Sequence, residues 1–213
     1  MSTGSWELPE EYRMLRDTVR RFMERDVKPI EDTLPHDANA PGDADLARLQ
    51  RTAREMGLWC VQSPKQYGGA ELSLLGQCII AEETAKCRMG AYIPALGAFG
   101  FDPPLPIFSG APWQIEKYAI PTIERGEKTY VAISEPSGGS DPARSIQTTA
   151  VRQGDRWVLN GTKVWITSAH LARWGLVFAR TERSAGRSGI SCFIVETDSP
   201  GLSMKTIPVI RSY

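Results

Sequence analysis

The first part of the sequence carries apolar residues at every third or fourth position, the spacing of one face of an α-helix. A first helix is predicted after Pro9, with Leu15, Val19, Phe22, Met23 and Val27 as its apolar positions. A second helix is predicted over residues 46–56, ending at Gly57, because glycine favours the position just after a helix. Ser73 is suited to cap a third, largely apolar helix over residues 74–87. The pattern therefore predicts a helical region at the start of the chain.

A short helix over residues 113–120, closed by Pro121, is predicted before the pattern changes near Gly126. Short β-prone runs follow, separated by turn signals. They are residues 130–133, 146–152, 157–159, 164–167, 176–179 and 192–195. Asn160-Gly161 between two such runs predicts a hairpin. The order of elements predicts an α+β protein with an all-α domain over residues 1–126 and an antiparallel β domain over residues 127–213.

Composition and charge narrow the possible functions. The 25 basic and 25 acidic residues among 213 cancel, so no long-range field favours nucleic acid or an anionic membrane. Four cysteines without a CxxC pair, and only two histidines, argue against a zinc site and against a disulfide framework. No apolar run is as long as a membrane span, and the first ten residues lack a signal pattern. We expect a soluble cytoplasmic protein with reduced thiols and no bound metal.

The stretch from Val131 to Asp141, with the sequence VAISEPSGGSD, combines a strand with a glycine-rich turn. Two adjacent glycines allow the backbone to approach a bound group closely, and serine hydroxyls with exposed amides can donate to carbonyls or phosphates. The same pattern also fits an ordinary β-turn with polar residues. It is neither the GxGxxG fingerprint of dinucleotide-binding folds nor the GxSxG motif of hydrolases.

Residues 132–141 closely resemble the first signature of the acyl-CoA dehydrogenase family. Three further segments agree with that family in order and spacing. They are residues 57–69 with the helix that contains Glu82-Glu83, residues 160–167 with the sequence NGTKVWIT, and residues 193–201. The resemblance covers essentially the whole chain, and it implies an N-terminal helical domain followed by an antiparallel β-barrel-like middle domain. It also implies the cofactor FAD.

The resemblance assigns roles to individual positions. It places the strand Val131, Ala132, Ile133 and Ser134 along the isoalloxazine ring, with the Ser134 hydroxyl bonded to the pyrimidine edge. The remaining cofactor-binding positions are Gly139, Ser140, Trp165, Ile166 and Thr167. Ser140 would contact the pyrophosphate and the acyl-CoA substrate, Trp165 would pack on the flavin, and Thr167 would donate toward flavin N5. Arg144 departs from the signature, which usually has a small residue there.

The activity implied by the resemblance is α,β-dehydrogenation of an acyl-CoA thioester, with hydride transfer to flavin N5 and an electron-transfer flavoprotein as acceptor. The family's catalytic base lies in a C-terminal helical domain, so no residue of this chain is nominated as catalytic. We therefore expect an N-terminal fragment, or a subunit that lacks the base, inactive by itself and associated in a homo- or hetero-oligomer. Two other functions stay open: a flavin monooxygenase or oxidase on the same scaffold, and a non-catalytic binding or assembly subunit.

Three weaker candidates have ordinary structural explanations. His170 follows the 167–168 corner, but a loop histidine with a satisfied hydrogen bond is the simpler interpretation. Phe99 and Phe101 would either line an acyl pocket or fill the helical core. Glu135 invites a role as a base, but it lies within the flavin turn, where the family uses it structurally.

Overall fold

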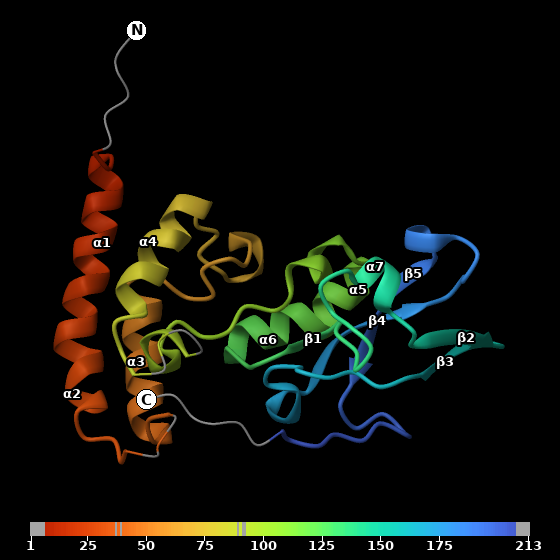
Figure 1. Ribbon diagram of the computed structural model, residues 1–213. Helices are drawn as coiled ribbons and strands as arrows, with labels where there is room; N and C mark the ends of the chain where they lie inside the picture. Colours follow the sequence, from red (N-terminus) through yellow and green to blue (C-terminus); the bar gives the residue numbers. More distant parts are fainter. Residues whose placement is uncertain (1–6, 37, 39, 89, 91–92, 208–213) are drawn as a thin grey trace, which may run out of the picture. The chain divides into compact units, whose positions relative to one another are not determined.

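The computed structural model describes residues 7–207 except residues 37, 39, 89, 91 and 92 (Figure 1). The described chain forms two compact units. Unit 1 comprises the residues up to Leu105 together with Ala119–Gly126, and unit 2 comprises Pro106–Tyr118 and the residues from Glu127 onward.

Unit 1 is helical. Helix α1 (Glu10–Phe22) continues through a π-helical turn (Met23–Val27) into α2 (Lys28–Glu31). The other elements are α3 (Asp43–Glu55), α4 (Leu74–Thr84) and α6 (Ile120–Arg125), with 3₁₀ turns at Lys65–Tyr67 and Pro94–Gly97. The helices predicted from the apolar spacing are confirmed, although α4 ends at Thr84 rather than at Cys87. Helix α6 includes Pro121 in its first turn, where proline needs no helical N–H partner, so the prediction that Pro121 closes a helix was wrong.

The predicted capping signals are also present. The Ser73 hydroxyl accepts a hydrogen bond of 3.2 Å from the Gly76 amide, which satisfies one of the free N–H groups at the start of α4. Gly57, after α3, has a φ of +69°, a conformation that glycine adopts without steric cost. The start of α4 and the end of α3 therefore follow from the local sequence.

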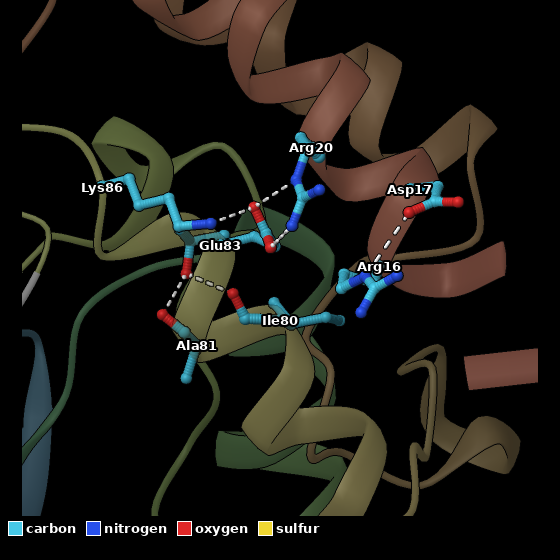
Figure 2. Close-up of polar contacts among 8 residues, drawn as sticks. Arg16, Asp17, Arg20, Ile80, Ala81, Glu83 and Lys86 are labelled. Atoms are coloured by element: carbon cyan, nitrogen blue, oxygen red, sulfur yellow. Dashed lines mark hydrogen bonds and ion pairs between the residues drawn. The ribbon is translucent and has the colours of Figure 1, made fainter. Parts of the chain in front are cut away.

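Helices α1 and α4 lie side by side in Figure 1 and are joined by an ion pair whose carboxylate is buried. Glu83 of α4 is 1 % exposed, and its carboxylate accepts hydrogen bonds from the Arg20 guanidinium at 2.7 and 3.2 Å (Figure 2). The Lys86 ammonium lies 2.6 Å from the same carboxylate. Around this pair, the core of unit 1 is apolar, with Val19, Phe22, Leu49, Ala53, Ile80 and Phe99 among its buried members.

Unit 2 contains a sheet and several short helical turns. Its strands are β1 (Tyr130–Ala132), β2 (Thr149–Gln153), β3 (Arg156–Asn160), β4 (Trp174–Arg180) and β5 (Ile190–Glu196). The helical elements are α5 (Pro112–Gln114), α7 (Pro142–Ser145) and 3₁₀ turns at Ala169–Leu171 and Gly186–Gly189. Two further turns, Leu105–Ser109 and the π-helical Ile115–Ala119, complete the list of elements.

The sheet is mixed and not closed into a barrel, which corrects the predicted antiparallel, barrel-like arrangement. Strand β4 pairs with β5 antiparallel on one edge, whereas its other edge meets β1 in parallel and touches β2 at Arg180. Parallel neighbours need a long connection, and the chain between β1 and β4 supplies one, because it includes the β2–β3 hairpin. Antiparallel pairing was inferred from the short spacing of the strands, which does not determine partners.

Two local predictions in this unit were wrong. Residues 164–167 form no strand, because Trp165 has a φ of +62° and interrupts the extended backbone. The hairpin turn lies at Gly154-Asp155, between β2 and β3, instead of at Asn160-Gly161. Gly161 instead allows close packing against Thr148, since a Cβ there would lie 2.2 Å from the Thr148 hydroxyl oxygen.

Candidate functional site

Strand β1 carries the first predicted site residues. Ala132 is buried in a small apolar cluster with Tyr130, whereas Val131 points to the opposite face and is 42 % exposed. Ile133 and Ser134 are half-buried beyond the strand's end. The alternation of the strand thus leaves the Val131 side chain at the protein surface.

A tight turn follows Ser134. Glu135 and Gly138 exchange two backbone hydrogen bonds of 3.0 Å, and Gly138 has a φ of +155°. A Cβ at Gly139 would lie 2.9 Å from the Ser134 hydroxyl oxygen, so only glycine leaves that hydroxyl in place. Ser140 is exposed at the end of the turn.

The second predicted segment meets the first at a backbone hydrogen bond, because the Val164 amide donates to the Ser134 carbonyl at 3.0 Å. Trp165 comes next and is 67 % exposed, an unusual environment for an indole. Ile166 packs against the cluster of Tyr130 and Ala132, and Thr167 is exposed. The structure therefore brings the two predicted segments together.

The junction is held by a buried ion pair that sequence reasoning missed. The side chains of Glu135 and Lys163 are 4 % and 11 % exposed, and the ammonium lies 2.8 Å from the carboxylate. The same carboxylate accepts hydrogen bonds from the Gln147 amide at 2.6 Å, the Thr148 amide at 3.0 Å and the Thr148 hydroxyl at 2.5 Å. In the sequence, the one sign of a cationic partner for Glu135 was Lys163, the single lysine of the 160–167 motif.

Its hydrogen bonds make this carboxylate a weak base. Burial alone would raise the pKa of Glu135, but hydrogen bonds from Lys163, from the Thr148 hydroxyl and from two amides outweigh burial and lower the pKa to about 2. A carboxylate with so low a pKa accepts a proton poorly. The contacts of Glu135 are thus to groups of the protein itself, which favours a structural role.

The donor groups at the junction fit a flavin. Among the described residues, the hydroxyls of Ser134, Ser140 and Thr167 have no hydrogen-bond partner. Hydroxyl donors of this kind match the carbonyl and phosphate acceptors of FAD, and the exposed indole of Trp165 offers an aromatic surface. The side chain of Arg144, the departure from the signature, is exposed on α7 and lies 3.5 Å from the Asp141 carboxylate.

The weaker candidates lie elsewhere. Phe99 is buried and packs 5.6 Å from the Phe22 ring, so it fills the helical core. His170 is exposed in a 3₁₀ turn.

Two cavities of about 200 and 230 Å³ occur in unit 1, around Trp59 and around Glu83, and neither is lined by a predicted site residue. In the described part of the chain, no cluster of His, Cys, Asp or Glu is arranged to hold a metal ion.

Comparison with known proteins shows the family to which the chain belongs. Residues 9–124 match the model of the acyl-CoA dehydrogenase N-terminal domain, and residues 131–209 match that of the acyl-CoA dehydrogenase middle domain. The mitochondrial short-chain specific acyl-CoA dehydrogenase of Mus musculus is 36 % identical over 201 residues, which cover 94 % of this chain and 47 % of that protein. The chain belongs to the acyl-CoA dehydrogenase family, a class of flavoprotein oxidoreductases.

Solved structures are similar as well. One, described as an electron transferring flavoprotein of Acidaminococcus fermentans, aligns with a TM-score of 0.72 at 30 % identity, over 97 % of this chain and 53 % of that one. A glutaryl-CoA dehydrogenase from Mycobacterium smegmatis in complex with FADH2 aligns with a TM-score of 0.67 at 26 % identity, over 94 % and 49 %. The chain thus spans about half the length of the relatives it matches.

No helix among the described residues is long and apolar enough to cross a bilayer.

Proposed function

We propose that this chain forms the N-terminal and middle domains of an FAD-dependent dehydrogenase that oxidises an acyl-CoA thioester between its α and β carbons. In this proposal the helical domain extends to about Gly126 and the β domain follows it. The observation that carries the proposal is the junction of the two signature segments, where the Val164 amide donates to the Ser134 carbonyl. Free hydroxyls and an exposed indole lie on those two segments.

The chain's own groups would hold the cofactor and the substrate. The backbone of Val131–Ser134 would lie along the flavin ring, with the Ser134 hydroxyl donating to its pyrimidine edge. Trp165 and Ile166 would pack beside the ring, and the Thr167 hydroxyl would donate toward N5. Gly139 would let the backbone approach the cofactor, and Ser140 would contact the pyrophosphate and the acyl-CoA. When bound, FAD would supply the acceptor for the hydride that leaves the β carbon.

The partners follow from the same proposal. An acyl-CoA would be the substrate, and an electron-transfer flavoprotein would receive the electrons. Association with further copies or with another chain, and a location in the cytoplasm, stay predictions. The catalytic base is not proposed among these residues, since Glu135 is held as a carboxylate with a pKa of about 2.

The test uses protein expressed from its complete gene. The proposal expects bound FAD, and it expects the oxidised-flavin absorbance to fall when an acyl-CoA is added without oxygen. Reoxidation by an electron-transfer flavoprotein, with little oxygen uptake in air, distinguishes a dehydrogenase from an oxidase or monooxygenase. A colourless protein that cannot be loaded with FAD would contradict the proposal and would favour a non-catalytic assembly role.

A further inference from the structure

One buried carboxylate connects three separate stretches of unit 2. Glu135 belongs to the turn after β1, its amide donors come from Gln147 and Thr148 just before β2, and its ammonium partner Lys163 follows β3. The carboxylate accepts hydrogen bonds from four protein donors, three at Oε1 and one at Oε2. The carboxylate is therefore not a free binding group; it joins the turn after β1 to the open end of the β2–β3 hairpin, and β1 pairs with neither strand of that hairpin.

Lys163 makes a second contact that strengthens this connection. Its ammonium also donates to the Ile133 carbonyl at 2.9 Å, so it contacts the chain on both sides of Ser134. The next residue, Val164, donates its amide to Ser134 itself. The position of Trp165 relative to the Ser134 hydroxyl is thus fixed by the Lys163 contacts, by this backbone hydrogen bond and by the packing of Ile166 against β1.

Close packing lets the segment before Lys163 approach the residues just before β2. Gly161 lies against Thr148 so tightly that a Cβ would be 2.2 Å from the Thr148 hydroxyl oxygen, and that hydroxyl in turn donates to Glu135. Trp165 and Ser168 both have positive φ values of 62°, so the segment after Lys163 is not a regular strand that could position itself by ladder hydrogen bonds. The contacts of Lys163 therefore help to hold this segment where a regular strand would be held by ladder hydrogen bonds.

We propose that Lys163 and Glu135 are positioning residues for the flavin: their ion pair sets the spacing between the Ser134–Gly139 turn and the segment from Trp165 to Thr167. This inference rests on the proposed function, because it assumes that a flavin lies on these two segments. Neither residue is expected to react, and each acts through the groups that it holds in place.

The variant Lys163→Met tests the inference, because it keeps the length of the side chain and removes its charge. Lys117→Met is the matched control, since Lys117 forms a 2.9 Å ion pair with Glu196 in the same unit and outside the turn. Thr148→Val is a milder variant that removes only the hydroxyl donor to Glu135. It keeps the inference testable if Lys163→Met fails to fold.

The first measurement is amide hydrogen exchange in the flavin-free protein. Lys163→Met should accelerate exchange at Val164 at least tenfold, while amides in the β4–β5 pairing, such as that of Ala179, exchange as in the parent. Equal acceleration at Val164 and Ala179 would show general destabilisation and would overturn a positioning role. Lys117→Met should leave Val164 unchanged.

The second measurement is FAD binding and flavin potential in protein from the complete gene. We expect the Kd for FAD to rise at least tenfold in Lys163→Met and about threefold in Thr148→Val, and the potential of the flavin that remains bound to shift. A parent that binds FAD together with a Lys163→Met variant of unchanged Kd and potential would overturn the positioning role and leave the proposed function intact. A parent that binds no FAD would instead refute the proposed function, and this inference with it.

Discussion

Replacing Arg20 with methionine should destabilise unit 1 strongly at neutral pH and only weakly in acid. Arg20 on α1 makes two hydrogen bonds to the buried Glu83 carboxylate of α4 (Figure 2). Without it, the carboxylate keeps Lys86 but loses the partner that matters most. Arg16, on the same helix, is the matched control because its contact with Asp17, 3.4 Å long, is exposed.

The expected loss of unfolding free energy follows from the environment of the Glu83 carboxylate. The hydrogen bond from Arg20 is the main cause that lowers the pKa of Glu83 from 4.5 to about 2; burial opposes it and Lys86 assists. That difference corresponds to about 3 kcal/mol of unfolding free energy at pH 7. Arg20→Met should therefore cost about 2 kcal/mol, the larger share, whereas Arg16→Met should cost less than about 0.5 kcal/mol.

The pH dependence has a definite sign. A carboxylate whose pKa is lowered by folding stabilises the protein above its ordinary pKa, and the stabilisation disappears as pH falls from about 4.5 to about 2. The difference between parent and Arg20→Met should accordingly shrink between pH 5 and pH 3, to roughly half or less of its neutral value. Urea unfolding followed by circular dichroism at several pH values measures it. A cost under about 0.5 kcal/mol at pH 7, or a cost independent of pH, would refute the reasoning.

Three further predictions concern the flavin site and the backbone. Ser134→Ala should lower the reduction potential of bound flavin, because it removes a donor worth about 1.5–3 kcal/mol to the pyrimidine edge, which gains negative charge on reduction; an unchanged potential in redox titration would contradict this. Ser140→Ala should weaken FAD retention without moving the potential of the flavin that remains, as equilibrium dialysis and the same titration would show. Gly126→Ala should cost about 2–4 kcal/mol of unfolding free energy, since φ is +62° and the new Cβ would lie 2.5 Å from the Trp59 ring. Gly154→Ala, with a φ of +63° and open space, should cost only about 1 kcal/mol, and equal costs would be evidence against the packing argument.

Much of the fold could be predicted because its signals are local. The apolar spacing from Leu15 to Val27, the cap at Ser73 and the stop at Gly57 depend on residues within one or two helical turns. The short β-prone runs likewise located β1, β4 and β5 to within a few residues. For the site, the two signature segments identified the residues that the structure joins through Ser134 and Val164.

The sequence by itself thus determined which segments are helical and most of those that are extended, and it nominated the candidate flavin contacts. Only the tertiary structure decided that β1 runs parallel to β4, that residues 164–167 leave the strand conformation, and that Lys163 pairs with Glu135. The reason is physical: strand partners and buried charges are selected by which distant segments meet. A lysine next to a β-prone run gives no local sign that it will pair with a carboxylate twenty-eight residues earlier. Contacts of that kind come into existence when the chain folds.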